Sequence, residues 1–268
     1  MSRPWFENQW FENQWFKPHI TLGLAQDGVA VRLPGKTASM LSTQNLTHHN
    51  DQTVFAALQQ HKNLLAKQKI RLIISNYFMR YAVLPWQDGV HARQDWLALA
   101  NHAFRQQFGA VADNWQVRVS LGGYGQTVIA SALDQALYDS LQECAHEFNF
   151  SWQAIEPLAM RLFNQAKLPE TAWMLIAEPQ HLLLCETFQG QIQRFSAASP
   201  PAGQESSVAA QMINRAQLQL PSQQQPANSL VHVSGYLNGS WPKAEIHGQQ
   251  HVFAKQKHLH HASWLLNL

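Results

Sequence analysis

The stretch HITLGLAQDGVAVRL, residues 19–33, has the pattern of a β-hairpin. Two apolar runs flank Gln26-Asp27-Gly28, and an Asp-Gly pair between such runs favours a tight turn. A similar pattern returns later in the chain, where residues 172–177 and 181–188 flank Glu178-Pro179-Gln180. The sequence therefore predicts two related lobes, each opened by a hairpin.

Helices and further strands fill the rest of the chain. Apolar spacing predicts helices at residues 51–67, 93–108, 133–148, 157–166 and 207–218. Strands are predicted at residues 70–75, 77–84, 115–121, 127–131, 151–155, 192–195 and 230–235. This order indicates an α/β protein with mixed sheets covered by helices. We expect an N-terminal arm at residues 1–18, a first lobe at 19–165, and a smaller second lobe with a C-terminal tail at 166–268.

The composition excludes several classes of protein. Hydrophobic residues make up 46% of the 268 residues, which argues against intrinsic disorder. The formal net charge of +2 gives no electrostatic footprint of a nucleic-acid binder. The cysteines, Cys144 and Cys185, form no CxxC pair, which favours a reducing compartment. No apolar stretch approaches the length of a membrane span, and the N-terminus lacks the apolar core of a signal peptide, so we expect a cytoplasmic protein.

The N-terminus holds an exact repeat, in which Trp-Phe-Glu-Asn-Gln occurs twice and is followed by Trp-Phe. A five-residue period matches neither a helix nor a strand. Exposed aromatic side chains are costly, so we expect this arm to pack on its own lobe or to dock on a partner, a second copy or a membrane surface, unless it is an artefact of expression. The candidate contact residues are Trp5, Phe6, Trp10, Phe11, Trp15 and Phe16.

Two features carry a resemblance to known proteins. The glycine-bearing hairpins, with a late strand that runs into Gly235, are similar to the actin-like, ribonuclease-H-like fold. A more specific resemblance comes from the segment LIISNYFMRYAVLPW, residues 72–86. It is accompanied by the helix that contains Trp96, the pair Phe108-Gly109, the strand that begins at Trp115, and residues 130–134. Over residues 19–260 this pattern resembles the PilM-like and GspL-like cytoplasmic proteins of type IV pilus, mannose-sensitive pilus and type II secretion assembly. The resemblance implies an actin-like scaffold at the inner face of the inner membrane, docked to a short cytoplasmic peptide of a single-span partner.

The nucleotide site that the actin-like fold implies is incomplete in this sequence. Such a site needs a carboxylate after the first strand to hold hydrated Mg²⁺, and a turn whose amides face the phosphates. Here the strand that contains Gly23 has Ala25, or at best Gln26, where the carboxylate is expected, and Pro179 removes an amide from the second turn. Gly235 stands alone where an adenine site usually has two glycines. We therefore expect vestigial nucleotide positions, no cofactor and no catalysis.

Other chemical motifs are absent from the sequence. The histidines 247, 251, 258, 260 and 261 lack the spacing that places two metal ligands on one helical face, so no metal is expected. Cys144 and Cys185 fall inside a helix and a strand and are expected to be buried thiols. The Gly122-Gly123-Tyr124-Gly125 segment is followed by a strand and predicts a hairpin turn, not a phosphate loop.

Arg80 and Asp134 are charged residues in apolar surroundings. For Arg80 we expect a structural role against a carboxylate or an aromatic ring, with contact to a partner peptide as the alternative. The sequence as a whole favours a non-enzymatic adaptor in pilus or secretion assembly that binds an inner-membrane protein. The alternatives are an actin-like phosphotransferase or ATPase, and a peripheral membrane-binding module.

Overall fold

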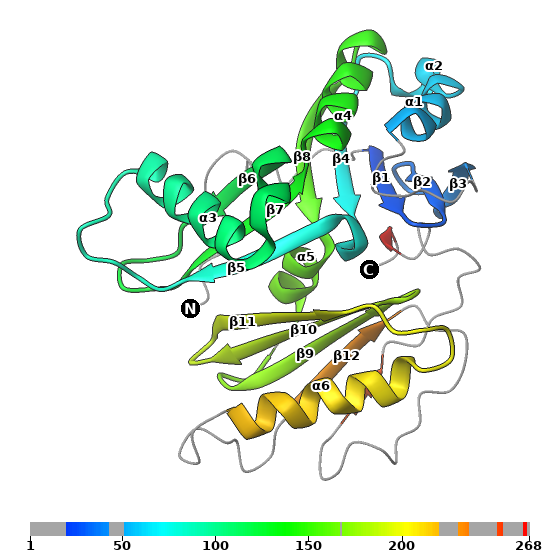
Figure 1. Ribbon diagram of the computed structural model, residues 1–268. Helices are drawn as coiled ribbons and strands as arrows, with labels where there is room; N and C mark the ends of the chain where they lie inside the picture. The colour runs from blue at the N-terminus through cyan, green and yellow to red at the C-terminus, as the bar shows by residue number, and fades with distance from the viewer. Residues whose placement is uncertain are drawn as a thin grey trace. The chain divides into compact units, whose positions relative to one another are not determined.

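The computed structural model describes residues 20–42, 51–166, 168–219, 230–235, 251–253 and 265–266 (Figure 1). These residues divide into two compact units. The first unit takes the described residues up to Arg161 together with Leu265 and Leu266, and the second runs from Leu162 to Phe253.

The first unit is built on a five-stranded sheet in the order β3-β2-β1-β4-β8. Its strands are β1 (Ile20–Ala25), β2 (Gly28–Arg32), β3 (Ser39–Ser42), β4 (Lys69–Ile74) and β8 (Ser151–Pro157). Its helices are α1 (Asp51–Gln59), α2 (Lys62–Leu65), α4 (Gln135–Glu147) and α5 (Leu158–Gln165), of which α5 continues across the division between the units. Val54 and Leu58 of α1 and Leu141 of α4 are buried, as are the β1 residues Leu22 and Leu24.

The second unit repeats this sheet in the order β11-β10-β9-β12-β13. Its strands are β9 (Ala172–Glu178), β10 (His181–Phe188), β11 (Gln191–Ala198), β12 (Leu230–Gly235) and β13 (His251–Phe253). Helix α6 (Glu205–Gln219) lies across this sheet (Figure 1) and packs Ala209 and Ile213 against Trp173 and Leu175 of β9.

The prediction of two lobes with a shared topology is confirmed. In the first unit β1 pairs antiparallel with β2 and parallel with β4, and in the second unit β9 pairs in the same way with β10 and β12. The two predicted hairpins therefore occupy equivalent places. The sequence does not predict β3 and β13, because both are short edge strands of four and three residues with little periodic signal.

A third sheet interrupts the first unit between β4 and α4. It contains β5 (Met79–Leu84), β6 (Trp115–Ser120) and β7 (Val128–Asp134) in the order β5-β7-β6. Helix α3 (Arg93–Phe108) and the 3₁₀ turn η2 (Gly109–Asn114) connect β5 to β6. Trp96, Ala100 and Phe104 of α3 pack against this sheet in a core of their own. We call residues 79–134 the inserted module (Figure 1).

Several element boundaries differ from the sequence prediction, and hydrogen bonds explain three of these differences. The prediction of a single helix at residues 51–67 is wrong. The backbone turns at His61, whose N–H donates to the Leu58 carbonyl, and this turn separates α1 from α2. The strand expected from Tyr77 begins at Met79, because Ser75 Oγ accepts from the Tyr77 N–H and closes the 3₁₀ turn η1 (Asn76–Phe78).

The third difference lies at the junction of β7 and α4. The helix expected from residue 133 starts at Gln135, because β7 continues to Asp134 and the Asp134 carboxylate accepts from the Ala136 N–H at 2.9 Å. Asp134 is therefore the N-cap of α4. Within the part of the chain that the structure describes, no helix combines the length and the apolar character needed to cross a bilayer.

Candidate functional site

Two positions of the expected nucleotide site lie on β1. Gly23 pairs with Ala30 of β2 and with Ile73 of β4, so it lies within the sheet. Ala25 ends β1, is completely buried and pairs with Gly28 across the turn. A carboxylate oxygen binds Mg²⁺ readily, whereas a methyl group has no lone pair to offer. The Ala25 side chain therefore supplies no metal ligand at the end of this strand.

The other two positions lie in the second unit. Pro179 is in the turn between β9 and β10, where it has no N–H to donate. Gly235 ends β12 and pairs with Ala177 of β9, which places both residues at the same end of that sheet. Neither residue contributes a polar side-chain group to its surroundings.

A buried polar cluster, which the sequence analysis did not identify, lies where β4 and β8 end. Asn76 is completely buried, and its Oδ1 accepts from the Tyr81 hydroxyl at 2.6 Å and from the Ala159 N–H at 3.1 Å. Glu156, the penultimate residue of β8, is also buried and accepts from Arg161 Nη1 at 3.2 Å. These bonds connect η1 to β5 and to α5, and β8 to α5. Polar residues placed directly after buried parallel strands were the available signal in the sequence.

Arg80 lies on β5 and has a structural role in its own neighbourhood. Its Nη1 donates to the backbone carbonyls of Met79 at 2.8 Å and of Tyr77 at 3.2 Å. Burial is the main cause that lowers the pKa of the Arg80 guanidinium, although arginine remains charged at any pH of interest. The guanidinium thus caps η1 and binds backbone oxygens where the sequence analysis expected a carboxylate or a ring. A contact between Arg80 and a partner stays a prediction.

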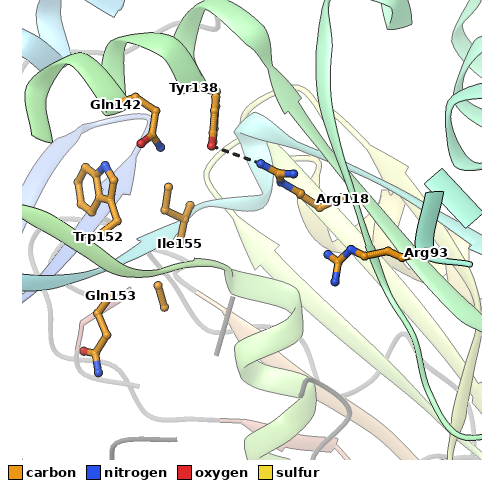
Figure 2. A pocket seen from close by; sticks show the side chains of 8 residues that line it. Arg93, Arg118, Tyr138, Gln142, Trp152, Gln153 and Ile155 are labelled. Carbon is orange, nitrogen blue, oxygen red and sulfur yellow. Dashed lines mark hydrogen bonds between the residues drawn. The ribbon is translucent and has the colours of Figure 1, made fainter. Parts of the chain in front are cut away.

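A pocket of about 160 Å³ opens between the inserted module and the main sheet of the first unit. The inserted module contributes Arg93, the first residue of α3, and Arg118 of β6. Helix α4 and strand β8 contribute the opposite wall, with the residues Tyr138, Gln142, Trp152, Gln153, Ala154 and Ile155. Figure 2 shows the two arginine side chains reaching toward the pocket from one side and Trp152, Gln142 and Ile155 on the other.

Hydrogen bonds hold the pocket side chains in place. Arg118 Nη2 donates to the Tyr138 hydroxyl at 3.4 Å, and its guanidinium carbon lies 5.9 Å from the centre of the Tyr138 ring (Figure 2). Arg93 Nη2 donates to the Val119 carbonyl at 3.3 Å, and Trp152 Nε1 donates to the Leu141 carbonyl at 3.0 Å. The pocket therefore has fixed aromatic walls and two guanidinium groups.

Strand β8 is the outermost strand of its sheet among the described residues, and the pocket lies along it. The pairing of β8 with β4 shifts between Trp152 and Ala154, so Gln153 is an extra residue in the strand. A bulge of this kind re-aims side chains at a sheet edge. It lets consecutive residues of β8 line the same pocket, which simple alternation along a strand does not predict.

Several residues that were singled out from the sequence lie outside the described residues. They are Trp5, Phe6, Trp10, Phe11, Trp15, Phe16, His247, His258, His260 and His261. His251 is the first residue of β13. Among the described residues no group of three or more His, Cys, Asp and Glu side chains is arranged to hold a metal ion.

Comparison with known proteins shows similarity in structure and not in sequence. No protein-family model and no curated protein matches the sequence. The cytoplasmic domain of EpsL, an inner-membrane component of the type II secretion system of Vibrio cholerae, superimposes with a TM-score of 0.56 and 9% identity over 94% of each chain. A protein of unknown function with an actin-like ATPase fold from Bacteroides thetaiotaomicron gives a TM-score of 0.55 and 13% identity over 82% of each chain.

The PilM–PilN type IV pilus biogenesis complex contains a third similar chain. It gives a TM-score of 0.54 and 8% identity, and the match covers 82% of this chain and 81% of that one. The resemblance inferred from the hairpins and from residues 72–86 is thus confirmed at the level of the fold. The chain has the actin-like fold, in the form that is similar to EpsL and to the PilM–PilN complex.

Proposed function

We propose that this protein is a non-enzymatic adaptor of a pilus-like or type II secretion assembly machine. In this proposal it works at the cytoplasmic face of the inner membrane and docks a short cytoplasmic segment of a single-span assembly protein. The structural similarity to EpsL, an inner-membrane component, and to the PilM–PilN complex supports this role. The segment binds in the pocket between the inserted module and β8.

The size and form of the pocket carry the proposal. Sites for nucleotides and other small molecules usually enclose roughly 300–1,000 Å³. The pocket here measures about 160 Å³, which suits one or two side chains of a protein segment better than a whole small molecule. Its walls come from two separate sheets, so a bound segment also links the inserted module to the main sheet. These properties favour a docking site over a reaction site.

The ends of the strands support the non-enzymatic part of the proposal. Phosphoryl transfer requires a metal ion that bridges the phosphates and groups that neutralise the charge that develops. Ala25 offers no metal ligand and Pro179 offers no amide donor. The alternative, an actin-like ATPase or phosphotransferase, needs a different metal ligand and has no specific observation in its favour.

Site-specific photocrosslinking in the source cells tests the docking site. A benzophenone amino acid replaces Gln142, an exposed residue that lines the pocket, and in a matched control it replaces Gln106, an exposed residue of α3. We expect the variant at position 142 to crosslink to a membrane protein through a short segment outside its span, identified by mass spectrometry. Equal products from both positions, or none from position 142, contradict the proposal.

A further inference from the structure

The pocket carries an excess of positive charge. Arg93 is exposed and Arg118 is half-buried, and both line the pocket. Among the described residues that line it there is no Asp or Glu. The only other polar side chains on these walls are neutral, namely Tyr138, Gln142, Trp152 and Gln153. A pocket of this composition attracts an anionic group and repels a cationic one.

The bonding of the two guanidinium groups leaves room for an anion. Arg93 donates to a backbone carbonyl, that of Val119, and Arg118 donates to a hydroxyl, that of Tyr138. Both acceptors are neutral, and a guanidinium carries several N–H donors in a planar fork that matches a carboxylate. Within the described residues, the structure records no carboxylate bound to either group. Each guanidinium is thus held in position with donors still available.

The remaining walls define what surrounds the anionic group. Ala154 and Ile155 are buried and apolar, and the half-buried Trp152 adds an aromatic surface. An aspartate or glutamate side chain combines a carboxylate with a short apolar stem and fits such a pocket. Free phosphate has no apolar part to cover these walls, and a nucleotide exceeds the volume of about 160 Å³.

We propose that the segment docked in this pocket carries an acidic side chain whose carboxylate accepts hydrogen bonds from Arg93 and Arg118. The inference rests on the proposed docking function and adds the chemistry that selects the partner. The stem of the acidic residue packs against Trp152 and Ile155. Because both arginines belong to the inserted module and the apolar wall belongs to β8, one acidic residue contacts both parts of the first unit.

A peptide selection tests this without knowledge of the partner. A random twelve-residue library displayed on phage is selected against the full chain, and enriched peptides are synthesised and titrated calorimetrically. We expect an Asp or Glu at one fixed position in the peptides whose binding is lost in Trp152→Ala. Replacing that residue by Asn or Gln lowers the affinity by about tenfold or more, because charge-assisted hydrogen bonds are lost.

Arginine variants assign the effect to the two guanidinium groups. R93Q and R118Q should each lower the affinity for the acidic peptide and leave the affinity for its Asn or Gln analogue nearly unchanged. R105Q is the matched control, because Arg105 is an exposed arginine of α3 whose carboxylate partner, Asp113, lies 3.4 Å away outside the pocket. It should leave both affinities unchanged.

The outcomes separate this inference from the proposed function. Peptides that need Trp152 but show no acidic preference overturn the inference and leave the docking function intact. An acidic preference that persists in R93Q and R118Q, or inorganic phosphate that binds as tightly as the acidic peptide, also overturns it. A selection that yields no peptide dependent on Trp152 contradicts the docking function itself.

Discussion

At the scale of single residues, the buried side chain of Asn76 is expected to stabilise the first unit through its hydrogen bonds. It is completely buried and joins three elements, because its Oδ1 accepts from Tyr81 and from the Ala159 N–H. Asn76→Ala removes the acceptor of two buried hydrogen bonds, and the loss of each costs about 1–3 kcal/mol. We expect a loss of about 3 kcal/mol in the free energy of unfolding, measured by urea titration with tryptophan fluorescence.

Asn101→Ala is the matched control for this substitution. Asn101 is exposed on α3, and its Nδ2 donates to the Leu97 carbonyl of its own helix. Exposed positions of this kind usually change stability by less than about 0.5 kcal/mol. If the two variants unfold at the same urea concentration, the buried hydrogen bonds of Asn76 do not stabilise the first unit as argued.

The two cysteines are expected to be inert in the folded protein. Burial, followed by the nearby Glu143 and Glu147, raises the pKa of the Cys144 thiol to about 12, and burial also raises the pKa of Cys185. A thiol with a raised pKa stays neutral, and only the thiolate is nucleophilic. At pH 8 we expect Ellman's reagent to detect no thiol in the native protein and both in urea. One thiol that reacts within the mixing time contradicts this.

The same shift gives a sign for the pH dependence of stability. The folded pKa of Cys144 lies above the unfolded value of about 8.5. The contribution of Cys144 to the free energy of unfolding is therefore fully present below pH about 8.5, and it is lost as the pH rises toward 12. Cys144→Ala should lack that part of the alkaline loss, which a pH series of urea titrations measures.

At the scale of secondary-structure elements, short sequence motifs predict turns and helix ends, which depend on neighbouring residues. Gln26-Asp27-Gly28 predicts the first hairpin, and Gly109, with φ of 76°, ends α3 where the sequence predicts its end. The sequence predicts the start of α4 two residues too early, because the apolar Leu133 continues the helical pattern. In the structure the backbone of Leu133 pairs with Gln116 of β6. Competition between a sheet ladder and a helix at such a junction depends on a partner strand that is distant in sequence.

Asp134 makes that junction testable. Asp134→Ala removes the N-cap bond to the Ala136 N–H, which should lower the free energy of unfolding by about 1 kcal/mol. Asp134→Asn keeps an acceptor of similar geometry and should cost much less. Urea titrations of both variants check this, with Asp139→Ala, an exposed change on the same helix, as a control. An equal loss in the Asn and Ala variants contradicts the capping role.

At the scale of the whole molecule, the repeated sheet was predictable and the pocket was not. The hairpin pattern occurs twice in the sequence, so it indicates the duplication directly. Arg93, Arg118, Tyr138 and Trp152 come from four elements, and each has an ordinary local setting. Only the order β5-β7-β6 and the edge position of β8 bring them together, and neither follows from periodicity.

The N-terminal aromatic arm yields a prediction at this scale that rests on sequence alone. Six large aromatics in residues 5–16 are too apolar to remain in water, so we expect them to be covered. Deleting residues 1–16 should lower the melting temperature at every protein concentration if the arm packs on its own chain. If the arm joins another molecule, the deletion should abolish association and leave the monomer's stability unchanged. A deletion that changes neither property contradicts the argument.

The last prediction concerns nucleotide binding by the whole molecule. The nucleotide site that the actin-like resemblance implies needs a carboxylate after the first strand and an amide donor in a hairpin turn. In this chain Ala25 ends β1, and Pro179 lies in the turn that follows β9. Without a carboxylate at the first and an amide at the second, the phosphates lack both a metal bridge and a donor. We therefore expect Mg·ATP to bind more weakly than the low-micromolar range, about −8 kcal/mol, in a calorimetric titration. Ala25→Asp alone should not restore tight binding, because Pro179 still removes the donor from the second unit. A low-micromolar dissociation constant for the unmodified chain contradicts both the argument and the non-enzymatic role.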